Sequence, residues 1–232
     1  LALGAATLAA RGLPHEDAAD AARILVHADM FGIHTHGVER ILSYGERLKI
    51  GGIKARAAVT ATPLSPSIIS IDGDNGLGPL VGMRALEAAM EAAKTNGLAL
   101  ALVRGSNHSG PICPSSYIAA QNGFATLIGS NATTTIAPWG GSEAKLGNNP
   151  FGFGLPNPGG DPLMLDMAMS VVARAKIRSA AKAGERIPNS WATDRDGNPT
   201  TDPAAALGGF LQPVGGHKGY GLALVVALIA GL

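Results

Sequence analysis

The amino-acid sequence predicts an α/β fold in which a helical N-terminal segment precedes an α/β core. Apolar residues recur at helical spacing through residues 15–50. Beyond residue 54, short β-forming runs alternate with amphipathic stretches, which is the pattern of strands covered by helices. The 232 residues are 46% hydrophobic and 15% charged, a composition that argues against disorder. We therefore divide the chain into a helical segment at 1–54 and an α/β core at 55–232.

The N-terminal segment is expected to form helices on both sides of Gly32. HEDAAD (15–20) supplies an acidic first turn, which suits a helix N-terminus. A second helix is expected to begin near Thr35 or His36 and to end at Gly51 and Gly52.

The core is expected to alternate strands and helices. VTATPLSPSIISIDGDNG is rich in β-forming and turn residues, and LVGMRALEAAMEAAKTNG predicts a helix that stops at Gly97. ALALVRG is a continuous apolar run, which favours a strand buried on both faces. SYIAAQNG predicts a helix, and three further strands are expected in FATLIGS, FGFGLPNP and PLMLDMAM.

One glycine-rich stretch imitates a dinucleotide-binding loop. GLGPLVG (76–82) is close to G-x-G-x-x-G, but its third glycine is one residue late and Pro79 interrupts it. No clear strand is predicted before it, and the acidic residue that the fingerprint needs roughly 20 positions later is absent. We interpret the stretch as a turn into a helix and not as a Rossmann phosphate loop.

Charge, cysteine content and the two ends exclude several classes. The net charge of +1 without a basic cluster argues against a nucleic-acid surface. The single cysteine, Cys113, cannot form an internal disulfide, so a cytoplasmic setting is expected. The final apolar run, GYGLALVVALIAGL, is shorter than the ~20 residues of a membrane span and predicts a buried helix. Both ends read as helix interiors, so we expect the chain to be a fragment.

FGIHTHGVER (31–40) is the first candidate site. On a helix, His36 and Arg40 would share a face, and His34 would point elsewhere. A solvated helix surface with Thr35 as cap is one interpretation. The other is that His36 exchanges a proton with a substrate oxygen while Arg40 binds a carboxylate through two hydrogen bonds. A metal site is disfavoured because no further ligands are nearby.

Four later stretches offer further candidates, each with an alternative. His108 in VRGSNHSG follows a predicted strand, where sites collect, although its ring could simply satisfy local backbone groups. The loop 136–156, with Asn149 in its N-N-P turn, could admit a flat ligand or be purely structural. Asp166 is expected to open a helical stretch, as an N-cap or a ligand contact. Lys218, just before an apolar helix, could contact phosphate or be solvated.

Together these stretches resemble the malate/L-lactate dehydrogenase family, which is distinct from the Rossmann-fold dehydrogenases of the same name. The matching motifs are collinear and cover nearly the whole chain: GIHTHGVER, NHSG, APWGGSEAKLGNNP, LDMAMS, GERIPNSWATDRDGNPTTDP and GGHKGYG. Several look particularly similar to ureidoglycolate dehydrogenase. Two positions differ from the family pattern, because Thr35 replaces a serine and Ala132 stands where a serine is common.

The resemblance implies a non-Rossmann NAD(P)-binding core and a homodimer. It also implies on the order of a hundred further residues that complete the cofactor pocket. It places proton transfer on His36 or His108 and substrate binding on Thr35 and Arg40. It maps cofactor contacts to the positions Asn149, Asp166, Met167, Ala168 and Lys218.

The expected function is reversible hydride transfer between NAD or NADP and a 2-hydroxy or 2-oxo acid such as malate, lactate or ureidoglycolate, without metal, nucleic acid or membrane. A histidine can give and take a proton near neutral pH, and an arginine can hold the substrate carboxylate. Reduction of a cyclic imine carboxylate is the main alternative. A non-catalytic ligand-binding chain and a metal hydrolase are the others.

Overall fold

The computed structural model describes residues 1–231, and the chain divides into two compact units. Unit 1 consists of Leu1–Thr126 and Phe153–Leu165. Unit 2 consists of Leu127–Gly152 and the residues from Asp166 onward. The boundary that the sequence predicts after residue 54 falls within unit 1. We describe each unit by itself.

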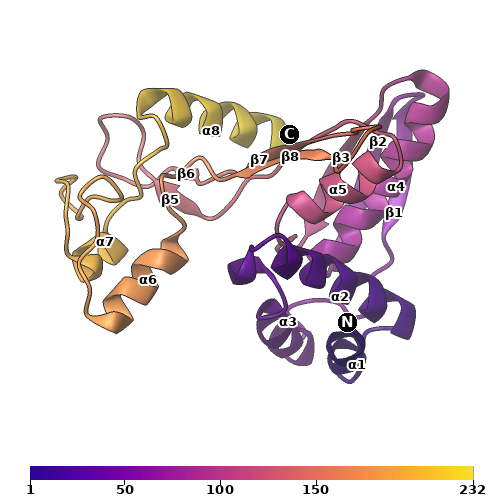
Figure 1. The fold of residues 1–232 in the computed structure, drawn as a ribbon, viewed down its shortest axis with the longest axis horizontal. Helices are drawn as coiled ribbons and strands as arrows, with labels where there is room; N and C mark the ends of the chain where they lie inside the picture. The colour runs from indigo at the N-terminus through magenta and orange to yellow at the C-terminus, as the bar shows by residue number, and fades with distance from the viewer. Residues whose placement is uncertain (232) are drawn as a thin grey trace. The chain divides into compact units, whose positions relative to one another are not determined.

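Unit 1 begins with a group of helices, which Figure 1 draws in indigo. Their bounds are α1 (Ala2–Ala9), α2 (His15–Met30), the short 3-10 helix η1 (His34–His36) and α3 (Arg40–Lys49). Glu16 and Asp17 lie in the first turn of α2, as its acidic start predicts. The helices share one apolar core: Leu8, Leu13, Ala18, Ala21, Leu25, Ile41, Tyr44, Leu48, Ile53 and Leu77.

The second helix begins later than the sequence predicts, so His36 and Arg40 do not share an α-helix. His36 ends η1, and Arg40 is the first residue of α3. The reason is a contact with another element. The Asp29 carboxylate, near the end of α2, accepts the backbone N–H of Val38 at 3.0 Å. This bond holds the chain in a turn where an uninterrupted helix was expected.

A three-stranded sheet forms the centre of unit 1. β1 (Thr60–Ser65) pairs antiparallel with β2 (Ile68–Gly76), and β2 pairs parallel with β3 (Leu100–Ser106). The helix α4 (Gly78–Asn96) connects the two parallel strands, which makes a βαβ unit. Pro79 lies in its first turn, and Gly97 ends it with a left-handed conformation at φ +77°. The β-rich stretch, the helix and its stop are therefore confirmed.

Two predictions about this βαβ unit are wrong. A strand, β2, does precede GLGPLVG; its alternation of buried and partly exposed residues was hidden by the polar residues Asp72, Asp74 and Asn75. In addition, β3 is not buried on both faces, because Leu100 is 48% exposed and Val103 is 40% exposed. The strand pairs only with β2 in the described sheet, and a run of apolar letters does not reveal what covers a strand.

The remaining predicted elements of the core are present. α5 (Cys113–Gln121) follows β3 after a six-residue loop, and β4 (Thr126–Gly129), β7 (Phe151–Leu155) and β8 (Leu163–Met167) form a sheet in the order β4-β7-β8. The strands expected in FATLIGS, FGFGLPNP and PLMLDMAM are confirmed.

Unit 2 contains a small sheet and three helices (Figure 1). β5 (Thr134–Ile136) pairs antiparallel with β6 (Leu146–Gly147), and the helices are α6 (Arg174–Ala183), α7 (Pro203–Gly208) and α8 (His217–Ala230). Asp202 caps α7 by accepting the N–H of Ala204 at 2.9 Å. The core of this unit is Ile136, Val172, Ile177, Ile187, Ala192, Ala206 and Leu211.

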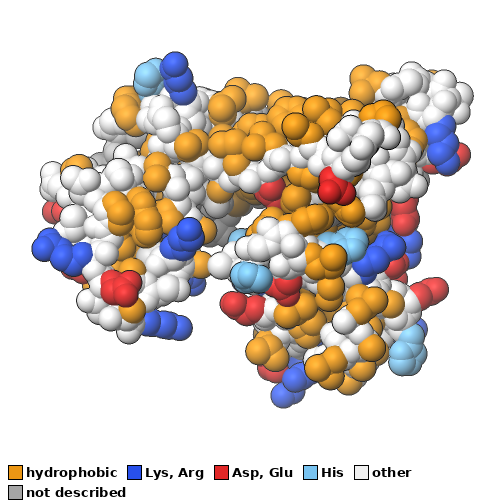
Figure 2. Space-filling model, in the orientation of Figure 1, with side chains coloured by type: hydrophobic (Ala, Val, Ile, Leu, Met, Phe, Trp, Pro, Cys, Tyr) orange, Lys and Arg blue, Asp and Glu red, His pale blue; other side chains and the backbone are white. Residues whose placement is uncertain are grey.

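The surface of α8 is largely apolar, and Figure 2 shows hydrophobic atoms over this helix. Five of its large apolar residues are exposed, namely Leu222, Leu224, Val225, Leu228 and Ile229. The buried helix that the C-terminal sequence predicts is therefore a helix, but one with an open face. Within residues 1–231, none of the helices combines the length and the apolar character that crossing a bilayer requires.

Candidate functional site

The turn that carries His36 is fastened to α2 by Asp29. One carboxylate oxygen of Asp29 accepts the Val38 N–H, and the other lies 3.1 Å from His34 Nδ1. A Cβ on Gly37 would come within 2.0 Å of this carboxylate, so only glycine fits there. His34 itself is 76% exposed. Asp29 therefore contacts the exposed His34, while the His36 side chain faces another direction.

Thr35 orients both functional side chains of this turn. Its hydroxyl lies 2.9 Å from His36 Nδ1, and its carbonyl oxygen accepts the Arg40 Nε–H at 2.8 Å. The second bond fixes the plane of the guanidinium through Nε, which leaves the two terminal nitrogens as a fork for a carboxylate. The cap role considered for Thr35 is not observed, because Thr35 lies inside η1 and its hydroxyl is paired with the histidine.

One face of α3 points toward the turn after β3. Arg40, Tyr44 and Arg47 are spaced by four and three residues, so they lie on the same side of the helix. Tyr44 Oη lies 2.7 Å from His108 Nδ1, and Arg47 Nη2 donates to Asn107 Oδ1 at 2.7 Å. Helix α3 therefore positions His108 across 64 residues of sequence.

His36 and His108 are brought together in unit 1. Their ring centroids are 5.5 Å apart and their planes are inclined by 26°, which is a stacked arrangement. Tyr44, only 3% exposed, lies on another side of the His108 ring with centroids 6.0 Å apart. We call His36, Arg40, Tyr44 and His108 the histidine cluster.

The surroundings of the cluster favour a neutral imidazole on His108. Partial burial of the ring is the main cause that lowers the pKa of His108 to about 4, and electrostatic interactions with His36, Arg40 and Arg47 lower it further. His108 remains exposed as a whole residue, so ligands and solvent can reach it. Burial also raises the pKa of Tyr44 to about 12, which keeps its hydroxyl protonated.

The turn that carries His108 is rigidly supported at its start. Asn107 Nδ2 donates to the backbone oxygens of Asn75 and Gly76 at 2.9 and 3.0 Å. Gly78, the first residue of α4, lies so close that a Cβ there would come within 2.1 Å of the His108 carbonyl oxygen. The N-terminus of α4 is thus occupied by the chain's own backbone, which agrees with the rejection of a phosphate loop at GLGPLVG.

The predicted cofactor residues all belong to unit 2, whereas the residues of the histidine cluster belong to unit 1. Asp166 and Met167 belong to the strand β8, and Ala168 follows it. Asp166 therefore does not open a helical stretch, and the N-cap interpretation is wrong, because the extended strand β8 continues through Asp166 to Met167. The next residue, Met169, is fixed by its N–H bond to the Asn148 carbonyl at 2.7 Å.

Asn149 and Lys218 have different settings. Asn149 is 1% exposed with φ +24°, and its amide joins two segments by accepting the Ala132 N–H at 3.0 Å and donating to the Ala223 carbonyl at 2.8 Å. Its side chain shapes the loop. Lys218 lies in the first turn of α8 and not before it, and it is exposed. A cation at a helix N-terminus can contact a phosphate group.

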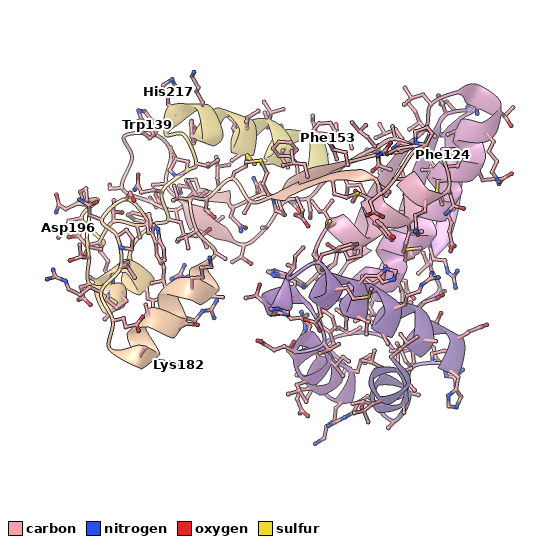
Figure 3. All side chains as sticks on the ribbon, viewed as in Figure 1. Phe124, Trp139, Phe153, Lys182, Asp196 and His217 are labelled. Carbon is pink, nitrogen blue, oxygen red and sulfur yellow. The ribbon has the colours of Figure 1, made fainter. Side chains whose placement is uncertain are left out.

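An aromatic pair flanks the start of α8. Trp139 is 56% exposed, and its ring contacts that of His217 edge to face with centroids 5.9 Å apart; Figure 3 labels both residues.

A metal site requires several ligating side chains close together. Within residues 1–231, no three side chains of the His, Cys, Asp and Glu types are grouped closely enough to hold an ion.

Comparison with known proteins decides the family. The model of the family described as malate/L-lactate dehydrogenase matches residues 2–232. The chain belongs to the malate/L-lactate dehydrogenase family. This confirms the resemblance and, with it, the α/β fold class of that family.

Members of the malate/L-lactate dehydrogenase family resemble this chain at similar levels. It is 39% identical over 231 residues to (2R)-3-sulfolactate dehydrogenase (NADP(+)) of Chromohalobacter salexigens, covering 99% of this chain and 69% of that protein. It is 35% identical over 221 residues to ureidoglycolate dehydrogenase (NAD(+)) of Escherichia coli, covering 95% and 63%. The structure of delta1-piperideine-2-carboxylate reductase from Pseudomonas syringae pvar. tomato superposes with a TM-score of 0.92, 32% identity and coverage of 98% and 69%.

The chain spans part of these family members' length, between 63% and 69% of the relatives named above. Within that span the structure brings together the predicted residues His36, Arg40 and His108. Thr35 is hydrogen-bonded to both His36 and Arg40. Sequence reasoning missed Tyr44, Arg47 and Asn107. Tyr44 and Arg47 lie four and seven residues after Arg40, which was a usable signal for a shared helix face, but Tyr44 looks like an ordinary core residue of a helix.

Proposed function

We propose that the chain serves an NAD(P)-dependent oxidoreductase that moves a hydride between nicotinamide and a 2-hydroxy or 2-oxo acid. The observation that carries the proposal is the histidine cluster, in which a neutral imidazole lies beside an oriented guanidinium. The family relatives support it, since their names include dehydrogenases of hydroxy acids with NAD or NADP. Bound NAD(P) would supply the acceptor or donor of the hydride.

Arg40 is proposed to hold the substrate carboxylate. Its Nε is engaged with Thr35, so the remaining fork can form two parallel hydrogen bonds to one carboxylate. Such a contact fixes the α-carbon of the acid in one orientation. A fixed orientation is what direct hydride transfer requires, because the reacting carbon must face the nicotinamide.

His108 is proposed as the proton-transfer residue, with His36 beside it as the second candidate. Its lowered pKa leaves the ring unprotonated at neutral pH, which is the form that accepts a proton from a substrate hydroxyl. In the oxidation direction the hydroxyl O–H bond breaks as a proton moves to the imidazole. The same group returns the proton when a 2-oxo acid is reduced.

The cofactor contacts are proposed for unit 2. Lys218 would hold a phosphate of NAD or NADP, and Asp166, Met167 and Ala168 would line the cofactor. Asn149 would act through the loop conformation that its amide maintains. A homodimer and a cytoplasmic location complete the proposal. The homodimer rests on the family resemblance, and the cytoplasmic location rests on the single cysteine.

A cyclic imine carboxylate is the second substrate class, favoured by one relative and one solved structure whose names give such a compound as substrate. The similar structure with a TM-score of 0.92 is a delta1-piperideine-2-carboxylate reductase. The same carboxylate contact and the same proton donor would serve an imine nitrogen in place of a carbonyl oxygen. The two classes differ in the atom that is protonated, so a substrate panel separates them.

The test is a screen of the purified full-length protein, including the further residues that the resemblance implies, with NADH and NADPH against 2-oxo acids, cyclic imine carboxylates and non-acid ketones, followed by His36→Ala and His108→Ala. At least one substitution is expected to reduce kcat by about 100-fold. Turnover that survives both substitutions near the wild-type level would refute the assignment. Failure to bind either nucleotide would favour a non-catalytic ligand-binding chain.

A further inference from the structure

The hydroxyl of Tyr44 makes two contacts with a single residue, and they constrain each other. Tyr44 Oη lies 2.7 Å from His108 Nδ1 and 3.3 Å from the His108 carbonyl oxygen. A hydroxyl carries one hydrogen, whereas its oxygen can also accept. A carbonyl oxygen can only accept, so its contact must be donated by Tyr44.

If the Tyr44 hydrogen points to the carbonyl, the shorter contact must run the other way. The imidazole then donates through Nδ1–H to the Tyr44 oxygen, and both contacts are hydrogen bonds. In the opposite arrangement, Tyr44 donates to a bare Nδ1 and the carbonyl loses its donor in this pair. The first assignment satisfies more polar groups in a place where Tyr44 is 3% exposed and unpaired groups are costly.

The protonation state of Tyr44 supports this assignment of the two hydrogen bonds. Burial raises its pKa to about 12, so the hydroxyl keeps its hydrogen through the neutral range. The ring of Tyr44 is packed in the same apolar core as Leu25, Leu48 and Leu77, which prevents the hydroxyl from swinging away. The contact is therefore a fixed feature of α3 and not a mobile surface pair.

We propose that Tyr44 is a positioning residue that holds His108 as the Nδ1–H tautomer, with a bare Nε2 directed away from Tyr44. This deepens the proposed function and rests on it for its catalytic meaning. A bare Nε2 can accept the hydroxyl proton of a 2-hydroxy acid: the O–H bond breaks, the Nε2–H bond forms, and the hydride leaves for the oxidised nicotinamide. The ring becomes an imidazolium whose Nδ1–H bond to Tyr44 persists.

The wrong tautomer would be unproductive. With hydrogen on Nε2, the face that meets the substrate could not accept a proton, and the ring would first have to exchange hydrogens between its nitrogens. Control of tautomer by a hydrogen-bonded neighbour is a known way to set histidine reactivity. Tyr44 would do here with a neutral hydroxyl what a carboxylate does in serine hydrolases, without adding a negative charge beside Arg40.

The direct test is nitrogen-15 NMR of the histidine rings at neutral pH, with the His108 signals assigned by their loss in His108→Gln. The wild-type protein is expected to show a protonated Nδ1 and a bare Nε2. A protonated Nε2 with a bare Nδ1 would overturn the proposal. This readout needs neither substrate nor cofactor, so it can fail or succeed independently of the proposed activity.

The variants are Tyr44→Phe and, as a matched control, Tyr117→Phe. Tyr117 also contributes a hydroxyl, which accepts from Gln121 at 2.8 Å and lies on α5 outside the histidine cluster. Tyr44→Phe is expected to mix the two tautomers and to lower kcat by about 10- to 100-fold, whereas Tyr117→Phe changes neither. An unchanged His108 tautomer in folded Tyr44→Phe contradicts the proposal.

The outcomes separate the two proposals. The expected tautomer in a protein that turns over no acid or imine would leave Tyr44 as the holder of His108 and refute the enzymatic role. Turnover with the opposite tautomer would keep the enzyme and refute the role of Tyr44. If Tyr44→Phe does not fold, the wild-type tautomer still decides.

Discussion

Arg40 is oriented before any ligand arrives, because Thr35 binds its Nε through a backbone carbonyl. Lysine at this position would keep the charge but lose both the Nε bond and the planar fork. Arg40→Lys is therefore expected to lower kcat/KM for carboxylate substrates by about 10- to 100-fold, as one of two charge-assisted hydrogen bonds is lost.

Non-acid ketones from the same screen serve as the control for Arg40→Lys. They lack the carboxylate, so their kcat/KM should change far less. An equal loss on both substrate types would show that Arg40 supports the local structure and does not bind the carboxylate.

The pKa of His108 also predicts how stability depends on pH. The folded state has a pKa of about 4, below the ~6.5 of an unfolded chain, so between these values only the unfolded chain binds the proton. Lowering the pH from 7 to 4 therefore favours unfolding. His108 keeps contact with water, so we discount its contribution to about 1 kcal/mol, or about 2–4 °C in Tm.

Thermal unfolding of His108→Asn between pH 7 and 4 measures this contribution. The fall in Tm across the range should be smaller than in the wild type by that amount. His15→Asn is the control, since His15 is an exposed residue at the start of α2. Parallel Tm curves for wild type and His108→Asn would contradict the lowered pKa.

At the scale of elements, the turn between α2 and α3 depends on one close approach. A Cβ at residue 37 would meet the Asp29 carboxylate at 2.0 Å, so Gly37→Ala must push the turn away from α2. We expect a loss of about 1–3 kcal/mol in stability. We also expect a larger proportional loss of activity, because His36 and Arg40 move with the turn.

Gly82→Ala is the matched control for that substitution. Gly82 lies within α4, and no atom outside its own helix lies within 4 Å of the position its Cβ would take. Alanine favours helix by about 1 kcal/mol over glycine, so this variant should be neutral or slightly stabilised in chemical denaturation. If Gly37→Ala behaves like Gly82→Ala, the Asp29 contact does not determine the turn.

The elements show where sequence reasoning succeeds and where it stops. Local patterns were enough for α4, because its amphipathic repeat and its stop at Gly97 are contiguous in the sequence. They were not enough for the turn at His36, since its anchor, Asp29, belongs to another helix. Tyr44 could not be assigned to the site either, because its partner lies 64 residues away and its apolar neighbours make it resemble core.

At the scale of the whole chain, the helical core of unit 1 and the core of unit 2 are separate apolar clusters, so we expect core substitutions to have local effects. Leu25 is fully buried in the helical core of unit 1, and Ile177 is fully buried in the core of unit 2. Truncation of either to alanine removes buried methylene groups and should cost about 2–5 kcal/mol.

Hydrogen exchange locates the damage of each truncation. Ile177→Ala should lose protection in α6 and α7, whereas Leu25→Ala should lose it in α1, α2 and α3. A uniform loss across residues 1–231 in both variants would mean that the two units unfold as one.

The close seating of α4 on the His108 turn limits how this chain can be altered. The first residue of that helix lies directly against the backbone of residues 107 and 108, so the turn has no room to grow inward. Libraries that aim at new substrates should therefore vary side chains at fixed loop length. Insertions after Ser106 would displace a helix of 19 residues together with the imidazole, and most such clones should be inactive.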